Sequence, residues 1–576
     1  MKQFLHATII LVLGCLSLTS FGQTSGREVL DSLFGKSQEV YFKCTIHDRS
    51  DIQNLTRIIS IDRVKGNELF AYANRKEFTA FLSKNLVYTL LPHPGSLLTE
   101  MEVNPYGSTK RPLNATTWDA YPTYDQYVSD MVGFAAAHPA ICRLDTVGTT
   151  VQGRLILAVK ISNNVNQDEA EPELLYTSSI HGDETTGYVL MLHLIDYLLS
   201  NYGTDPAITN MVNTTAIFIN PLANPDGTYH GGNGSVLGSQ RYNANGIDLN
   251  RNYPDPKVGQ HPDGNAWQAE TQAWMAYAAV NHFTMSANFH GGSEVFNYPW
   301  DTWPKLAADD AWWQFVGREW ADTVHKYSPS GYFTDEMNGI TNGYAWYELN
   351  GGRQDYMNYF HNCREVTVEL SYNKTLPANQ LITYWNYNYH TFLNYITETH
   401  YGFNGIVTDT ATGLPLAAKV YIALHDMDFS EVYSSLPSGF YARPIAEGSY
   451  NVTFSATGYF PKTISNVTVT KWNTTSLNVQ LKPLSYGLQD KAISTGMIYP
   501  NPSEGSFRLV LPEGSATTVL VEVTNTLGRV IYTSAIDPGT DRKSAEISVP
   551  GILPGIYLVR IQAGSKIYVD KLVIRY

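Results

Sequence analysis

The sequence predicts an α/β domain in the middle of a multidomain chain, with β-rich units after it. The 576 residues, 43% of them hydrophobic, greatly exceed one domain and suggest three or four. Two strand-like apolar runs, 174–180 and 284–289, each end in a polar turn, and a helix-like apolar segment over 188–199 follows the first. After about residue 402 the pattern changes to short alternating strands punctuated by turns, which is typical of β-sandwiches.

The turns after the two apolar runs carry the residue types of a metal site. His181 and Glu184 lie in the His-Gly-Asp-Glu turn after the first run, and His290 precedes the Gly-Gly turn after the second. Sites assemble at strand ends in α/β sheets, so we expect these side chains to meet. Two histidines and one carboxylate are the usual ligands of a catalytic zinc, which lowers the pKa of a bound water to about 7.

A polar segment over residues 241–254 supplies further candidate groups. It contains two arginines and many amides but few apolar residues, so it would make a poor core segment. Arginine suits bidentate capture of a carboxylate, and a neighbouring asparagine adds a neutral donor. A site for a free C-terminal carboxylate needs such groups. The alternative interpretation is a solvated polar loop.

Together these motifs resemble the M14 family of zinc metallocarboxypeptidases, in particular the branch of carboxypeptidases N, E and D, over roughly residues 118–400. The resemblance implies a mixed-sheet catalytic domain with helices on both faces and one Zn²⁺ per catalytic domain. The implied zinc ligands are His181, Glu184 and His290. The groups implied to hold the terminal carboxylate of the substrate are Asn250 and Arg251.

The same resemblance assigns roles to four more residues. Arg241 would polarise the scissile carbonyl and stabilise its oxyanion, and Asp248 would orient a zinc histidine. Glu369, on one face of an alternating strand, would be the general base that passes a proton to the leaving amine. Tyr347, just ahead of a Gly-Gly pair, would be the mobile tyrosine that closes over the substrate, although residues 357–359 depart from the pattern of the branch.

Asp301 bears on substrate preference. It stands eleven residues after His290, where the resembled branch has an acid in the pocket for the terminal side chain. A buried carboxylate there would select lysine or arginine, because a neutral side chain would leave its charge unpaired. A surface acid in a turn is the alternative.

The N-terminal part of the sequence predicts a signal peptide followed by a small domain. Residues 1–22 have a lysine, an apolar core and small residues near the end, which is the pattern of a secretory signal peptide. Residues 27–110 mix alternating apolar stretches, among them 57–61, with a helix-like segment over 74–81. They predict a small α/β unit, either a propeptide-like domain that masks the cleft or a permanent accessory domain. No other segment has the run of about 18 apolar residues that spans a membrane, so we expect no transmembrane segment in the mature chain.

Two β-rich units follow the central domain. Residues 403–483 resemble the transthyretin-like β-sandwich that follows the catalytic domain in the resembled branch. Residues 486–576 open with Tyr-Pro-Asn-Pro and close with a Lys-Leu-Val-Ile run, and they resemble a type IX secretion sorting domain. That resemblance implies a bacterial protein that export machinery carries across the outer membrane. An adhesive accessory module is the alternative for this last unit.

The sequence as a whole predicts a secreted or bacterial cell-surface zinc exopeptidase that acts on the C-termini of peptides or proteins and releases Lys or Arg. The alternatives are a cell-wall stem-peptide hydrolase with the same metal site and a non-catalytic surface binding protein. The formal charge of −14 fits many soluble secreted proteins, and nucleic acid is not an expected partner. Three cysteines outside the leader, Cys44, Cys142 and Cys363, leave room for a single disulfide at most.

Overall fold

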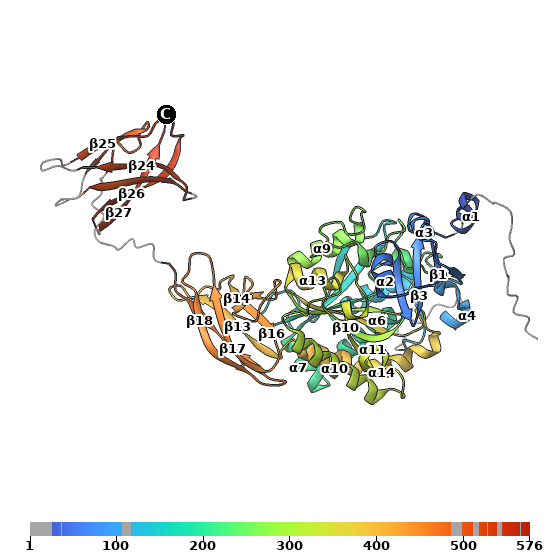
Figure 1. Ribbon diagram of the computed structural model, residues 1–576. Coiled ribbons are helices and arrows are strands. Elements are labelled where there is room, and N and C mark those ends of the chain that lie inside the picture. The colour runs from blue at the N-terminus through green and yellow to red at the C-terminus, as the bar shows by residue number, and fades with distance from the viewer. Residues whose placement is uncertain are drawn as a thin grey trace, which may run out of the picture. The chain divides into compact units, whose positions relative to one another are not determined.

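The computed structural model describes residues 26–35, 37–105, 117–484, 498–510, 518–526, 528–537, 544–564 and 566–575. The expected signal peptide, residues 1–22, lies outside the described residues. The chain divides into two compact units, one up to Pro483 and one from Leu484 (Figure 1). Within the described ranges, no helix is both long enough and apolar enough to cross a membrane.

The first unit begins with a four-stranded sheet in the order β2-β3-β1-β4, which we call the N-terminal domain. Its strands are β1 Glu39–Thr45, β2 Ser60–Lys65, β3 Glu68–Asn74 and β4 Tyr88–Leu91. Its helices are α1 Gly26–Leu33, α2 Arg49–Leu55, α3 Arg75–Leu82, the 3-10 turn η1 Pro94–Ser96 and α4 Glu100–Val103. A capping box between Asn74 and Glu77 starts α3 at the position expected from the sequence. The strand expected over 57–61 lies later, because 56–59 form a turn before β2.

The central domain is built on an eight-stranded mixed sheet in the order β11-β10-β12-β9-β7-β8-β6-β5. The strands are β5 Cys142–Thr149, β6 Leu155–Ile161, β7 Glu173–Ser178, β8 Ala216–Asn220, β9 Phe283–His290, β10 Glu294–Tyr298, β11 Ile340–Asn342 and β12 Arg364–Leu370. Neighbours β12, β9, β7 and β8 run parallel, whereas β10 pairs with β12, and β6 with β8, in the antiparallel sense. The predicted mixed sheet is confirmed.

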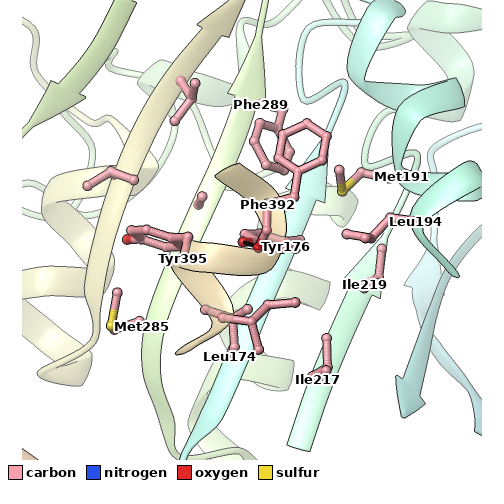
Figure 2. Packing of buried hydrophobic residues seen from close by; sticks show 14 of the residues in the cluster. Leu174, Tyr176, Met191, Leu194, Ile217, Ile219, Met285, Phe289, Phe392 and Tyr395 are labelled. Carbon is pink, nitrogen blue, oxygen red and sulfur yellow. Dashed lines mark hydrogen bonds between the residues drawn. The ribbon is translucent and has the colours of Figure 1, made fainter. Parts of the chain in front are cut away.

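Helices cover both faces of this sheet, as expected. They are α5 Tyr124–Ala137, α6 Thr186–Asn201, α7 Pro206–Thr214, α8 Pro225–Thr228, α9 Ala269–Val280, α10 Asp310–Tyr327, α11 Asp335–Asn338, α12 Gly343–Trp346, α13 Arg353–His361 and α14 Ala378–Glu398. Alternation along β7 sends Leu174 and Tyr176 to one face and Leu175 to the other. Figure 2 shows the first face, where Tyr176 packs with Phe392 and Tyr395 of α14. On the opposite face, Leu175 belongs to a cluster that includes residues of α9 and α13.

A β-sandwich follows α14. Its strands are β13 Gly402–Asp409, β14 Lys419–Ile422, β15 Val432–Tyr433, β16 Phe440–Pro444, β17 Gly448–Ser455, β18 Lys462–Val469, β19 Thr474–Ser476 and β20 Val479–Leu481. The buried Arg443 joins it to the central domain, because its guanidinium binds Asp309 before α10 as well as Asp426 of the sandwich. Arg364 of β12 binds the same Asp309 carboxylate. The sandwich is therefore anchored by buried ion pairs.

The second unit is also all β. Its strands are β21 Ile498–Tyr499, β22 Ser506–Val510, β23 Val519–Asn525, β24 Val530–Ile536, β25 Ser544–Ser548, β26 Gly555–Ala563 and β27 Lys566–Ile574. They form a three-stranded sheet, β21-β22-β25, and a four-stranded sheet, β24-β23-β26-β27. Apolar side chains of both sheets, such as Leu509 and Val559, share one core. The expected second β-sandwich is confirmed. Cys44, Cys142 and Cys363 are buried and free, so no disulfide joins these three.

Candidate metal centre and active site

The metal-ligand candidates converge at the carboxyl ends of β7 and β9. The Nδ1 atom of His290 lies 3.1 Å from Nδ1 of His181 and 2.8 Å from Oε2 of Glu184, and His181 Nδ1 lies 3.0 Å from Glu184 Oε1. All three residues are buried, and their ligand atoms lie within 4.8 Å of one another. Two ring nitrogens and a carboxylate that face one point suit a zinc ion. The residues that the sequence singled out do come together.

The protonation states of these residues suit metal binding. Burial lowers the pKa of His290 to about 4, so its ring is neutral, which is the form that binds a metal ion. Burial alone would raise the pKa of Glu184, but His181 and Lys374 beside it hold that pKa well below its usual range. On the far side of the His181 ring, Nε2 lies 3.0 Å from Oδ1 of Asp248. Such a partner fixes the tautomer and leaves Nδ1 for the metal.

Glu369 of β12 stands next to this cluster because of strand register. In the parallel pairing of β9 with β12, Glu369 is the partner of His290. Burial, and after it the negative charge of Glu184, raises the pKa of Glu369 well above its usual range. Its Oε2 atom is buried and meets no hydrogen-bond partner within the described part of the chain. A buried carboxyl with a raised pKa and a free oxygen has the properties of a proton-transfer group.

Two arginines from the polar segment enter the same site. Arg241 donates from Nη1 to Glu184 Oε1 at 2.9 Å and from Nε to Asp248 Oδ2 at 3.3 Å. Arg251 is buried too, but its Nε and Nη2 atoms meet no partner among the residues that the structure describes. A buried guanidinium with two open donors is costly unless it binds an anion. Asn250 and Arg251 both line the small cavity beside the metal-ligand candidates.

Asp301 lies in the wall of that cavity and is buried, so it is not a surface acid. Its Oδ1 accepts hydrogen bonds from Asn297 Nδ2 at 2.9 Å and from Gln354 Nε2 at 3.1 Å. Gly343 makes room for the carboxylate, since a Cβ atom there would lie 1.7 Å from Asp301 Oδ1. Burial raises the pKa of Asp301 to about 6. Gln354 is a neighbour that the sequence had not assigned to the site.

Comparison with known proteins fits this geometry. A family model described as zinc carboxypeptidase matches residues 127–391. The catalytic chain of rat carboxypeptidase N is 33% identical over 401 residues, which are 62% of this chain and 85% of the relative. The chain belongs to the zinc carboxypeptidase family. Its second unit matches a secretion system C-terminal sorting domain over 497–575, which indicates a secreted or cell-surface protein.

Other similarities of this zinc carboxypeptidase family member are partial. Mouse carboxypeptidase D is 37% identical over 374 residues, which are 60% of this chain but only 26% of that protein. The solved structure of the carboxypeptidase A from Helicoverpa armigera is similar in fold, with a TM-score of 0.50 at 16% identity, over 62% of this chain and 96% of that one. A model described as a carboxypeptidase regulatory-like domain matches residues 402–482, the first β-sandwich.

The N-terminal domain enters the carboxypeptidase cleft, which the sequence could only raise as one of two alternatives. Ser60 donates to Asp248 Oδ2 at 2.5 Å and accepts from Arg241 Nε at 2.8 Å. Ile61 and Asp62 line the same cavity as the metal-ligand candidates, and that cavity measures only about 20 Å³. Typical ligand sites measure hundreds of Å³. Beside the metal-ligand candidates, the chain's own β2 therefore leaves only a small cavity.

Further hydrogen bonds and apolar contacts attach the N-terminal domain around the site. The carboxylate of Glu39 accepts hydrogen bonds from the backbone N–H groups of Arg241 at 2.6 Å and Tyr242 at 2.9 Å. The Tyr72 hydroxyl donates to Asp183, the neighbour of Glu184 in the chain, at 2.6 Å. Tyr347 lines the cavity and also packs against the hydrophobic core of the N-terminal domain. The tyrosine that the family resemblance suggests as a lid is therefore already packed against the N-terminal domain.

One cation in the site was not anticipated. Lys374, in the loop between β12 and α14, places Nζ 2.6 Å from Glu184 Oε1 and 2.6 Å from Asp62 Oδ1. The sequence has a polar Tyr-Asn-Lys stretch just after Glu369, but such a stretch is too common to identify Lys374 as a site residue. Glu270 of α9, by contrast, makes structural contacts, because its carboxylate accepts hydrogen bonds from Asn243 Nδ2 and from the backbone N–H of Val151.

Removal of a ligand candidate tests the metal centre. We expect the full-length chain to bind one zinc ion and His290→Ala to lose stoichiometric binding, because two ligands hold a catalytic zinc poorly. Asp248→Asn should weaken zinc affinity by roughly 10–100-fold through the His181 ring. Equilibrium dialysis with metal analysis measures both. His390→Ala, whose ring stacks on Tyr327 away from the cleft, is the matched control and should bind like the wild type. Equal binding by His290→Ala would contradict this site.

Proposed function

We propose that the protein is a zinc-dependent exopeptidase that hydrolyses the C-terminal peptide bond of peptides or proteins and releases Lys or Arg. The observation that carries the proposal is the convergence of His181, Glu184 and His290 beside Glu369, with the open guanidinium of Arg251 in the same cavity. A zinc ion held by the three ligand candidates would lower the pKa of a bound water and polarise the scissile carbonyl.

The terminal carboxylate of the substrate is proposed to bind Arg251. Its Nε and Nη2 donors form the fork that matches a carboxylate, and both lack a partner in the described residues. The Asn250 side chain is held in place because its Oδ1 accepts the backbone N–H of Arg353 at 2.9 Å. A free carboxylate is what distinguishes a chain end from an internal peptide bond. This pairing supports exopeptidase over endopeptidase activity.

Proton transfer and charge stabilisation fall to two further side chains. Glu369 is proposed to take a proton from the attacking water through its free Oε2 and to deliver it to the leaving amine. Arg241 is proposed to stabilise the negative charge that develops on the scissile carbonyl oxygen. Its position is well defined, because Glu184 and Asp248 bind its Nη1 and Nε atoms. Both groups also argue against a non-catalytic binding protein.

Selection of the terminal side chain is assigned to Asp301. The carboxylate is buried among the amides of Asn297 and Gln354, which bind only its Oδ1 atom. A lysine or arginine side chain would pair with the charge, whereas an apolar side chain would leave the ionised carboxylate without a counter-charge. Tyr347, which lines the same cavity, is proposed to close over the bound residue.

The N-terminal domain is proposed to mask this cleft, rather than to be a neutral accessory domain. Its Ser60, Ile61 and Asp62 occupy the space next to Arg241 and the metal-ligand candidates, and about 20 Å³ cannot hold a peptide end. Substrate access then requires displacement or removal of the domain. The C-terminal unit is proposed to carry the protein through a type IX export system and to be removed afterwards, which fits its match to a sorting domain.

Hydrolysis of blocked dipeptides tests the activity. We expect chelator-sensitive release of Arg and Lys, with much slower release of Phe and Glu. Glu369→Gln should lower kcat by about 10²–10⁴-fold because the proton-transfer group is lost. The exposed Glu169→Gln is the matched control and should retain wild-type rates. Release of Phe in preference to Arg would contradict the selection of basic side chains by Asp301. Hydrolysis of cell-wall stem peptides alone would favour the alternative of a stem-peptide hydrolase.

The pH dependence of selectivity tests Asp301. The carboxyl must be ionised to attract a cationic side chain, and burial raises its pKa to about 6. Selectivity should therefore be present above pH 6 and decline as pH falls through this value. We expect the ratio of kcat/KM for Arg over Phe peptides to fall about tenfold from pH 7.5 to 5, because most carboxyls are then protonated. The ratio cancels titrations common to both substrates. Asp301→Asn should give a low ratio at all pH values, and a pH-independent wild-type ratio would contradict the assignment.

Weakening the attachment of the N-terminal domain tests the masking. Glu39→Gln keeps the size of the side chain but turns charge-assisted hydrogen bonds to Arg241 and Tyr242 into weaker neutral ones. We expect the rate of Arg release by the full-length chain to rise about tenfold. Glu68→Gln, in the same domain but away from the cleft, should leave the rate unchanged. A folded Glu39→Gln variant with the wild-type rate would show that the domain does not limit access.

A further inference from the structure

Lys374 is a buried cation at the edge of the proposed active site that the proposed reaction does not use. Its side chain is 4% exposed, and its ammonium group has three partners. Nζ lies 2.6 Å from Glu184 Oε1 and 2.6 Å from Asp62 Oδ1, and it donates to the backbone carbonyl of Gly291 at 2.9 Å. Two of these partners belong to the central domain, and the third, Asp62, comes from the N-terminal domain.

Asp62 reaches Lys374 because β2 is irregular at this point. In the pairing of β2 with β3, Ile61 faces Ala71 and Arg63 faces Phe70, so Asp62 is the extra residue of a β-bulge. A bulge re-aims a side chain out of the regular alternation. The Asp62 carboxylate is held in this direction by the Tyr41 hydroxyl, which donates to Oδ2 at 2.9 Å. Glycine at 292 leaves it room, since a Cβ there would lie 3.1 Å from Asp62 Oδ1 and 3.3 Å from Lys374 Nζ.

Masking alone does not require this ion pair. Ile61 lines the cavity, and Ser60 and Glu39 bind the Arg241 segment through hydrogen bonds that do not involve Lys374. Asp62 adds a buried ion pair between its carboxylate and the Lys374 ammonium group of the cleft. When the N-terminal domain is displaced, one donor of the ammonium group loses its partner, which is costly for a buried charge unless another anion replaces it.

The other anions expected in the cleft already have partners. The terminal carboxylate of the substrate has Arg251, and the developing oxyanion has Arg241, which Glu184 and Asp248 hold in position. The terminal side chain faces Asp301, which would repel an acid. A second carboxylate that meets Lys374 must therefore belong to a residue on the N-terminal side of the scissile bond.

We propose that Lys374 forms a subsite for an acidic side chain upstream of the scissile bond, and that Asp62 is its intramolecular occupant. This inference rests on the proposed exopeptidase function and narrows its substrate class. The preferred substrates are peptides that end in Lys or Arg and carry Asp or Glu shortly before that end. Asp62 competes with such peptides for Lys374, so the same contact contributes both to masking and to selection.

A simpler role for Lys374 is to position Glu184, and the two roles predict different kinetics. A positioning residue affects all substrates alike, since it acts on a metal-ligand candidate. A subsite affects only peptides with the acidic residue. The ratio of kcat/KM between a Glu peptide and its Gln counterpart isolates the subsite, because every effect common to both peptides cancels.

The test uses zinc-loaded, full-length Asp62→Asn protein and blocked peptides that end in Arg, with Glu or Gln at the first, second or third place before it. We expect a Glu to Gln ratio of about ten at one of these places, the gain of one charge-assisted contact. The ratio should fall to about one in Asp62→Asn/Lys374→Met and be partly kept in Asp62→Asn/Lys374→Arg. Asp62→Asn/Arg57→Gln controls for non-specific attraction of acidic peptides by positive charge, because Arg57 is an exposed cation of the N-terminal domain, which also carries Asp62. This control variant should keep the Glu to Gln ratio of Asp62→Asn.

Two outcomes would overturn the subsite. One is a ratio near one at all three places in Asp62→Asn, and the other is an equal loss for Glu and Gln peptides on introduction of Lys374→Met, which would leave Lys374 as a positioning residue. If no peptide is hydrolysed by any variant, even after limited proteolysis of the N-terminal domain, the proposed function fails, and calorimetric titration of the same peptides into Asp62→Asn decides the subsite separately. Tenfold tighter binding of the Glu peptide would support it, whereas equal or absent binding would overturn it.

Discussion

The parallel pairing of β9 with both β7 and β12 is the constraint on which the site depends. Ser178 at the end of β7 pairs with Phe289, and Glu369 near the end of β12 pairs with His290, so β9 fixes the positions of the metal-ligand candidates and of Glu369 along the sheet. A slip of one residue along β9 would send His290 to the opposite face of the sheet. The aromatic packing of Phe289 against Tyr176 and Phe392 opposes such a slip, which links the hydrophobic core directly to the chemistry.

Charge balance explains how so many ionisable groups share a small buried volume. Arg241 and Lys374 both bind Glu184, and Asp248 binds Arg241 and His181, so each ionised group within this cluster has a partner of opposite sign or a ring nitrogen. The N-terminal domain completes the network with Ser60 and Asp62. Its attachment is therefore mainly polar at the cleft, which suits the proposed displacement of the domain better than a continuous apolar interface would.

Much of the site was predictable because it follows from local pattern. His181, Glu184, His290 and Glu369 stand at the ends of apolar or alternating runs, where strand ends place them at one sheet edge. The roles of Glu369, Arg241, Asp248 and Arg251 rested on family resemblance. Lys374 and Asp62 could not be predicted, because their pairing joins residues more than three hundred positions apart and depends on a bulge in β2. The strand was expected too early, over 57–61, for a different reason: alternation does not reveal that residues 56–59 form a turn before β2.

Zinc-edge X-ray absorption on the zinc-loaded, full-length protein tests the central claim most directly, namely that strand register brings His181, Glu184 and His290 to one metal. The account predicts two imidazole nitrogens at about 2.0–2.1 Å together with carboxylate oxygen, and no sulfur. It also predicts that this two-imidazole signal is lost in His181→Ala. A sulfur ligand, an all-oxygen shell, or an unchanged spectrum in His181→Ala would contradict the account.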